Sequence, residues 1–289
     1  DDIRKERSTA ITSEEQKLYD KNGKSLDITI SKGEYITIYD EIDNRAKIIT
    51  SNGICGYIDI NGIENKTRLK PINDIPVKTQ TLVVSGKPVV LFDQITTMAA
   101  NNSSAKNNIP DAVDVLVPTW FSFATDENGK TDGKIISLAD KTYVDSAHSK
   151  GRKVWGLITD NFNSSVSRSV VVSSKTREYV INQITSYVKQ YNLDGINVDF
   201  ENIPSDSMRE FTQFLRELSV ALNNIDVCLS IDVYTPEPWS LYYNRDEFGE
   251  IVDYFIVMGY DEHTSSSEET GSVATKKWSE ESITLTMKV

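Results

Sequence analysis

The 289-residue chain has few of the residues that build disulfides and metal sites: it holds only two cysteines and two histidines. Cys55 and Cys228 lie far apart, in segments with different sequence patterns, so we predict no disulfide between them. His148 and His263 are too few for the His- and Cys-rich clusters that bind zinc. We therefore expect neither a disulfide-stapled fold nor a metal centre.

The sequence also lacks long apolar runs and an excess of positive charge. No run of about 18 apolar residues occurs, and the start, "DDIRKERSTA", has no apolar stretch of the kind found in signal peptides. The formal net charge of −12 would be repelled by nucleic-acid backbones and by anionic membrane surfaces. We expect no nucleic-acid or membrane partner, and a neutral polymer fits this charge better.

Short alternating segments separated by turns make up the sequence before residue 80. The segments "LDITI", "YITIYD", "RAKIIT" and "CGYIDI" predict a small all-β module over residues 24–64. Their order resembles bacterial Src-homology-3-like (SH3-like) domains, in which a "KG" turn opens one strand and a "GY" segment closes the barrel. Ala46 stands where such domains often carry tryptophan, and a spacer role and a glycan- or peptide-binding role both stay open. Residues 1–23 are left unassigned, and the polar stretch 65–87 predicts a linker.

Apolar runs alternate with amphipathic helical segments in residues 88–289. The runs are "PVVLFDQI", "VDVLVPTWF", "KVWGLIT", "DGINVDFE", "VCLSIDVY" and "DYFIVMGY". The helical segments include residues 137–151, 176–192 and 207–224. Such a pattern predicts an α/β domain with a parallel sheet covered by helices. No Gly-rich phosphate loop follows the first run, so we favour a (β/α)8 TIM barrel over a doubly wound sheet.

The segment "LDGINVDFENIP", residues 193–204, carries many polar side chains for a buried strand. Because strand side chains alternate, Asn197, Asp199 and Glu201 share one face. In a parallel barrel that face points inward, and Glu201 falls at the carboxyl end, where barrel enzymes carry their chemistry. Carboxylates about 7 Å apart disfavour joint ionisation, so one pKa should rise and that group can serve as an acid near neutral pH.

Polar and aromatic residues recur at the ends of the other predicted strands. The polar ones are Asp93, Gln94, Asp160, Asn161, Asp232, Tyr234, Tyr260 and Asp261. The aromatic ones are Trp120, Phe121, Phe123, Phe162, Tyr234, Trp239 and Tyr260. Any single aromatic side chain can simply pack in the core or at the rim, but seven at one barrel face suggest flat surfaces for sugar rings.

These residues carry a resemblance to family-18 glycoside hydrolases, the chitinase-like (β/α)8 enzymes. "LDGINVDFE" resembles the family signature D-G-x-x-x-D-x-E, and "MGYDEH" resembles its M-x-Y-D segment. "DGINVDFENIP", "DYFIVMGYDEH" and "TGSVATKKW" are similar to the bacterial branch of spore-cortex and peptidoglycan N-acetylglucosaminidases. The resemblance covers about residues 85–289 and implies cleavage of β-linked N-acetylglucosamine polymers.

The resemblance also implies a role for each matching residue. Glu201 would be the general acid, Asp199 would orient the acetamido group of the substrate, and Tyr260 would hydrogen-bond its carbonyl oxygen. Asp194 opens the motif and would hold local structure. The expected substrate contacts are Asn197, Asp261, Tyr234, Trp120, Asn161 and Trp239. The implied mechanism is substrate-assisted and retaining, with the N-acetyl oxygen as nucleophile, and requires no metal and no organic cofactor.

Several alternatives stay open at this point. A carbohydrate-binding, lectin-like protein on the same fold is the main rival, and a structural ion-pair network is a third interpretation. Chitin, peptidoglycan and spore cortex all carry the required acetamido group, and exo or endo action is not decided. We expect a monomer that acts outside the cell, in the cell envelope or on the spore. We count six barrel strands where the family has eight, so we expect a barrel that is incomplete at its C-terminal end and weakly stable by itself.

Overall fold

The computed structural model describes residues 7–50, 53–69, 87–104, 109–264 and 267–288. The chain divides into two compact units, Asp1–Val77 and Lys78–Val289, each of which is considered by itself. Most of the predicted linker 65–87, namely residues 70–86, lies outside the described residues. Among the described residues, no helix is both long enough and apolar enough to cross a membrane.

The first unit is an all-β fold, as the alternating segments predict. Its antiparallel sheet has the strand order β3-β2-β6-β5-β4-β1-β7. The strands are β1 (Ser8–Thr12), β2 (Gln16–Tyr19), β3 (Ser25–Ile30), β4 (Tyr35–Ile42), β5 (Arg45–Thr50), β6 (Cys55–Asp59) and β7 (Ile63–Arg68). The alternation that favours strands is clearest in β5, whose residues alternate strictly between half-buried and buried positions. Gly33, in the "KG" turn, has a φ of 78°, a backbone conformation that favours glycine.

The boundaries of this sheet are wider than the predicted module of residues 24–64. β1 and β2 precede residue 24, and β7 runs past residue 64 to pair with β1. The core of the sheet includes Ala10 and Leu18 from these early strands, packed with isoleucines of the later ones. β1 and β2 were missed because each is short and buries only two side chains, which leaves little hydrophobic pattern to detect.

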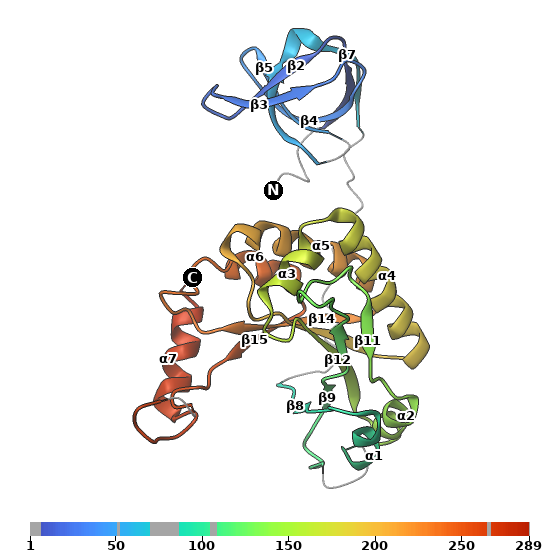
Figure 1. The fold of residues 1–289 in the computed structure, drawn as a ribbon, viewed down its shortest axis with the longest axis vertical. Coiled ribbons are helices and arrows are strands. Elements are labelled where there is room, and N and C mark those ends of the chain that lie inside the picture. The colour runs from blue at the N-terminus through green and yellow to red at the C-terminus, as the bar shows by residue number, and fades with distance from the viewer. Residues whose placement is uncertain (1–6, 51–52, 70–86, 105–108, 265–266, 289) are drawn as a thin grey trace. The chain divides into compact units, whose positions relative to one another are not determined.

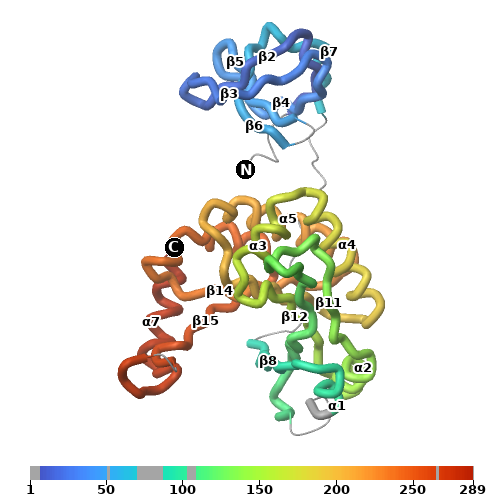
Figure 2. Tube along the Cα trace, viewed as in Figure 1, coloured from blue at the N-terminus to red at the C-terminus, as the bar shows by residue number. Residues whose placement is uncertain are grey.

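The second unit contains the predicted parallel sheet, in the form of a partial barrel. The parallel strands are β8 (Val90–Asp93), β9 (Val115–Pro118), β12 (Lys153–Thr159), β13 (Gly195–Asp199), β14 (Cys228–Tyr234) and β15 (Tyr254–Met258), in this spatial order. They coincide with the six apolar runs. β10 (Phe121–Phe123) follows β9, pairs in parallel with β12 and forms an antiparallel pair with β11 (Ile135–Ser137). Figure 2 allows the path from β8 to β15 to be followed.

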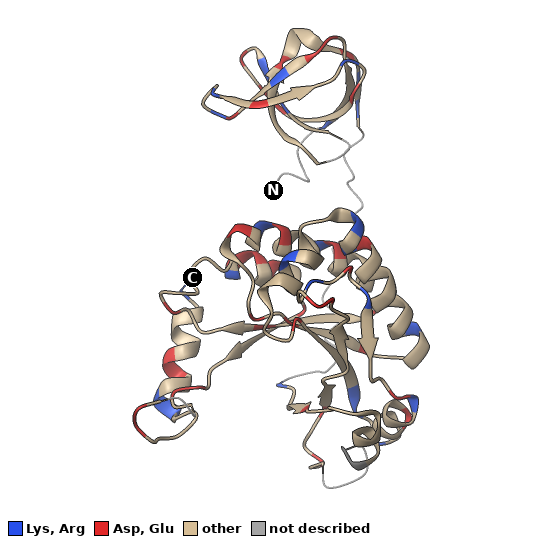
Figure 3. Ribbon diagram, in the orientation of Figure 1, with Lys and Arg blue, Asp and Glu red and all other residues tan. Residues whose placement is uncertain are grey.

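Helices connect the strands and cover the sheet. They are α2 (Lys141–Ser149), α3 (Ser164–Val171), α4 (Ser174–Tyr191), α5 (Met208–Asn223), α6 (Arg245–Ile251) and α7 (Lys276–Thr286), with a short α1 (Asn101–Ser104). Short 3-10 turns lie at Ile60–Gly62, Met98–Ala100 and Ser205–Ser207. Helices α3 to α6 lie along one side of the sheet (Figure 1), and charges of both signs are spread over the helices and loops (Figure 3).

The apolar face of α5 explains how the helical layer is held to the sheet. Phe211, Phe214 and Leu218 are fully buried, as the helical spacing predicts. They belong to the same core as Ile196 and Val198, which occupy the outward face of β13. The opposite face of β13 is thereby fixed toward the barrel interior, which is where the polar side chains of the motif lie.

Candidate functional site

The site is built on β13 and the neighbouring strand β14. The two strands run parallel, with Asn197 opposite Ser230 and Val198 opposite Ile231. The Asn197 side-chain amide donates to Ser230 Oγ and to Asp232 Oδ1, both at 3.0 Å. One rung beyond Asp199, the Tyr234 hydroxyl donates to Glu201 Oε2 at 2.5 Å. Polar side chains of the two strands therefore face each other in successive rungs. We call this set the polar ladder; it consists of Asn197, Asp199 and Glu201 on one side and Ser230, Asp232 and Tyr234 on the other.

Glu201 is half-buried, and its carboxyl group has a raised pKa. Burial raises its pKa, the hydrogen bond from Tyr234 acts in the opposite direction, and the charges of Asp160 and Asp261 raise the pKa further. Tyr243 donates to the Glu201 carbonyl oxygen at 2.7 Å and so fixes the backbone at this position. A half-buried carboxyl with a raised pKa and a fixed backbone has the features of a general acid.

Asp160, at the end of β12, anchors the loop that carries Glu201. Its carboxylate is fully buried and accepts hydrogen bonds from the backbone N–H groups of Phe162, Glu201 and Asn202 at 3.0, 3.4 and 3.3 Å. The Ser167 hydroxyl donates to the same carboxylate at 2.5 Å. The sequence showed Asp160 only as a polar strand end. Its role depends on a loop some forty residues further along the chain, and no local pattern could have revealed it.

Asp199, which is half-buried, and Asp232, which is buried, are two carboxyl groups with raised pKa values. Burial, with the neighbouring charges of Asp232 and Glu201, raises the pKa of Asp199 to about 8. Burial also raises the pKa of Asp232 to about 7, against the hydrogen bond from Asn197. The sequence predicts a raised pKa for one carboxyl group of the motif, and the strongest rise is that of Asp199. The charge of Asp232, on β14, contributes to this rise, and the sequence analysis did not connect the two residues.

Two buried oxygen atoms of this ladder have no hydrogen-bond partner among the described residues. They are Oδ1 of Asn197 and Oδ1 of Asp199. Buried polar atoms are nearly always paired, so each exception needs an explanation. An unpaired acceptor on Asp199 at the carboxyl end of the strand can receive an N–H group from a ligand.

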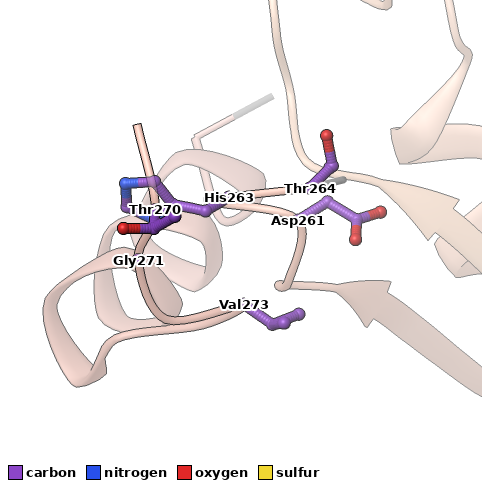
Figure 4. A pocket seen from close by; sticks show the side chains of 6 residues that line it. All are labelled: Asp261, His263, Thr264, Thr270, Gly271 and Val273. Atoms are coloured by element: carbon purple, nitrogen blue, oxygen red, sulfur yellow. The ribbon is translucent and has the colours of Figure 1, made fainter. Parts of the chain in front are cut away.

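Tyr260 and Asp261 follow β15 and lie at the exposed end of the site. The Tyr260 side chain is 48% exposed, and burial of its remainder, together with the charge of Glu201, raises its pKa to about 12. Asp261 lines a cavity of about 500 Å³ with His263, Thr264, Thr270, Gly271 and Val273. In Figure 4, the His263 ring lies beside Thr270 and Gly271, and the Asp261 carboxylate points to the other side.

The structure separates the predicted aromatic residues into exposed and buried ones. Trp239 and Phe162 are exposed, at 57% and 65%, and Trp239 lies edge-to-face against Tyr234 with ring centroids 4.8 Å apart. Trp120 is only 1% exposed, and its indole N–H donates to Asn101 Oδ1 at 2.8 Å. Trp120 therefore belongs to the core, and its prediction as a substrate contact is wrong. Phe121 and Phe123 are buried in the same core.

Asn197 and Asn161, both predicted to contact the substrate, lie in different surroundings. Asn197 is fully buried and bonded to its neighbours on β14, which places it below any surface that a polymer could reach. The structure therefore corrects its predicted role from direct contact to support of Asp232. Asn161 is exposed and has a φ of 54°, and Phe162 after it has a φ of 58°. Consecutive left-handed residues other than glycine are strained and often occur at ligand sites.

Asp194 lies at the opposite, amino end of β13. Its carboxylate interacts with His148 Nε2 at 2.7 Å, Lys153 Nζ at 2.8 Å and the Val154 backbone N–H at 2.9 Å. These contacts join β12, β13 and α2 away from Glu201, which suits a residue that holds local structure. In the described part of the chain, no group of three or more His, Cys, Asp or Glu side chains could hold a metal ion.

Known proteins resemble this chain in sequence and in fold. The glycosylase YvbX of Bacillus subtilis, named as uncharacterized, is 29% identical over 180 residues, which are 58% of this chain and 51% of YvbX. The structure of the putative sporulation-specific glycosylase YdhD of B. subtilis matches with a TM-score of 0.51 at 25% identity, over 58% of this chain and 57% of that one. The spore cortex-lytic enzyme SleL of Bacillus cereus shares the fold, with a TM-score of 0.61 at 16% identity over 70% and 48% of the two chains.

The chain spans about half the length of YvbX, the first of these relatives. Residues 91–284 match the sequence profile described as Glycosyl hydrolases family 18. This range is more than half of the chain and includes the ladder on β13 and β14 as well as Tyr260. The chain therefore belongs to glycosyl hydrolase family 18.

Proposed function

We propose that this protein is a glycosidase that cleaves β-linked N-acetylglucosamine polymers by substrate-assisted, retaining catalysis. The observation that carries the proposal is the arrangement of Asp199 and Glu201 at the carboxyl end of β13. Glu201 has a raised pKa and a hydrogen bond from Tyr234, and Asp199 has a buried oxygen without a partner. One residue can thus donate a proton while its neighbour receives a substrate N–H.

Three residues act on the substrate in this mechanism. Glu201 protonates the leaving glycosidic oxygen as the substrate's N-acetyl oxygen attacks the anomeric carbon and forms an oxazolinium ion. Asp199 accepts the acetamido N–H and, as an anion, stabilises the positive charge that develops there. Tyr260 hydrogen-bonds the acetamido oxygen and aligns it for attack. Glu201 then removes a proton from the incoming water, which restores both the sugar configuration and the acid.

The surroundings of the acid favour a polymeric, uncharged substrate. Trp239 and Phe162 present exposed rings near strand ends, and sugar rings stack on such surfaces. The net charge of −12 does not hinder the approach of a neutral glycan. Among such polymers we propose cell-wall glycans, because the relatives include a sporulation-specific glycosylase and a spore cortex-lytic enzyme. Action outside the cell, in the envelope or on the spore, and a monomeric state are parts of the same proposal.

The release of reducing ends tests this function. The protein is incubated with purified peptidoglycan, with spore cortex and with chitin oligomers, and the products are separated by size. A glycosidase shortens at least one of these polymers, and the preferred one identifies the substrate. A lectin-like protein would bind an oligomer and leave its length unchanged, which would refute the proposed activity.

The variant Glu201→Gln tests the assignment of the acid. The amide keeps the shape of the side chain but cannot donate the proton, so we expect turnover to fall by roughly a hundredfold or more while oligomer binding persists. The matched control is Glu178→Gln, which makes the same change at an exposed position on α4. Near wild-type turnover by Glu201→Gln would assign the acid elsewhere.

A further inference from the structure

The polar ladder has a middle rung that the proposed mechanism leaves unexplained. Asn197 faces Ser230 in the first rung, and Glu201 accepts the Tyr234 hydroxyl in the last. The register runs as far as Val198 opposite Ile231, and its continuation by one residue sets Asp199 opposite Asp232. Asp232 is only 6% exposed and Asp199 is half-buried, so two carboxyl groups face each other where water solvates them only in part.

Among the described residues, no ion pair brings a cation to this rung to balance two negative charges. Described ion pairs elsewhere in the unit join Asp194 to Lys153 and Arg177 to Glu217, and none reaches Asp199 or Asp232. One buried and one half-buried carboxylate repel each other when no cation balances them, so such a pair retains one proton. The raised pKa values of about 8 for Asp199 and about 7 for Asp232 agree with this.

The other titratable groups around the pair supply no positive charge. Glu201, two residues beyond the end of β13, and Asp160, at the end of β12, are acidic, and their charges raise the pKa of Asp199 further. Tyrosines Tyr234 and Tyr260 have raised pKa values because of burial and nearby carboxylates. The register partner of Asp232 on β15 is Ile256, and that of Asp199 on β12 is Thr159. The pair is thus surrounded by groups that are neutral or negative.

The residue that precedes Asp199 on the same face of β13 is Asn197, whose side chain cannot share the proton of Asp199. Its amide nitrogen donates to Asp232 Oδ1 at 3.0 Å, and an amide has no titratable proton of its own. Within β13, therefore, Asp199 has no neighbour below it that can accept a proton. The carboxyl group that faces Asp199 from the adjacent strand, and that can accept a proton, is Asp232.

We propose that Asp232 is a positioning residue that holds the proton of Asp199 during catalysis. The inference rests on the proposed function in one respect, namely that Asp199 must be anionic when the oxazolinium ion forms. The O–H bond at Asp199 breaks and an O–H bond at Asp232 forms, so the pair keeps one proton and a charge of −1. No electrons are transferred and no co-reactant is needed. Asp232 does not touch the substrate; it sets the charge of the residue that does.

A carboxyl titration of the ligand-free protein tests the shared proton without any need for activity. With aspartate carboxyl carbons labelled with ¹³C, the signal of Asp199 is assigned by its loss in Asp199→Asn and then followed against pH by NMR. In the wild type we expect Asp199 to titrate near pH 8. In Asp232→Asn the like charge is gone, so the Asp199 transition should move down by roughly one pKa unit or more.

Two further variants make the result decisive. Ser230→Ala removes the other hydrogen-bond partner of the Asn197 amide but no charge, so the Asp199 transition should stay where it is in the wild type. Asp199→Asn should lower the Asp232 transition reciprocally, which covers the case that Asp232→Asn does not fold. If each aspartate titrates unchanged when the other is replaced, the proton is not shared and the inference is overturned. If the titrations are coupled but no glycan is cleaved, the proposed function fails and the proton pair remains.

Discussion

Removal of the Tyr234 hydroxyl should shift the pH range in which Glu201 works as an acid. Tyr234 donates to Glu201 Oε2 at 2.5 Å, and this bond favours the ionised carboxylate. In Tyr234→Phe the bond is lost while the ring remains. The pKa of Glu201, already raised by burial, should therefore rise further, and the acid should stay protonated to higher pH.

The size of this shift follows from the strength of the bond. A hydrogen bond to a charged group contributes about 1.5–3 kcal/mol, and one pKa unit corresponds to about 1.4 kcal/mol. Glu201 is only half-buried, so solvent replaces part of the lost interaction and the effect is roughly halved. We expect the basic limb of kcat/KM to move upward by about one pH unit on a soluble N-acetylglucosamine oligomer.

A matched tyrosine separates this electrostatic effect from the loss of a hydroxyl group. Tyr242 donates to the carbonyl oxygen of Ile203 at 2.9 Å, so Tyr242→Phe removes the same group near the same loop without touching a carboxylate. Its basic limb should coincide with that of the wild type. A basic limb that does not move in Tyr234→Phe, or that moves equally in both variants, would refute the reasoning.

Two further predictions concern stability. The pKa of Asp199 in the folded protein, about 8, lies above its ordinary value of 3.8, so its contribution to stability is complete below about pH 4 and is lost as the pH rises toward 8. Asp199→Asn should therefore flatten the fall in Tm between pH 5 and pH 8, and an unchanged slope would contradict the raised pKa. Trp120→Ala should destabilise the fold by about 3–5 kcal/mol in a denaturant titration, because a fully buried indole is lost. Trp239→Ala, at an exposed position, should change the free energy of unfolding by about 0.5 kcal/mol or less and should raise KM on a polymer. A large loss of stability in Trp239→Ala, with a raised KM in Trp120→Ala instead, would show that Trp239 is the core residue and Trp120 the substrate contact.

Much of the catalytic unit could be predicted from the sequence because its signals are local. Six apolar runs gave six parallel strands, since a strand covered on both faces must be apolar along its length. The buried face of α5 followed from helical spacing in the same way. The motif on β13 identified Asp199 and Glu201 because alternation along one strand decides which side chains share a face.

Only the tertiary structure decided which residues of different strands meet. The pairing of Asp199 with Asp232 depends on the register of β13 against β14, and the support of Glu201 by Asp160 depends on two loops brought to one edge of the sheet. The orientation of Trp120 was equally hidden, because an aromatic residue after a strand can point into the core or into solvent, and packing against Tyr143 selects the core here. The sequence by itself determined the strands and pointed to Glu201 as the proposed acid, because the patterns that identify them lie within a few residues of each other. The partners that set the charge of the site come from other strands and loops, and only the folded sheet brings them together.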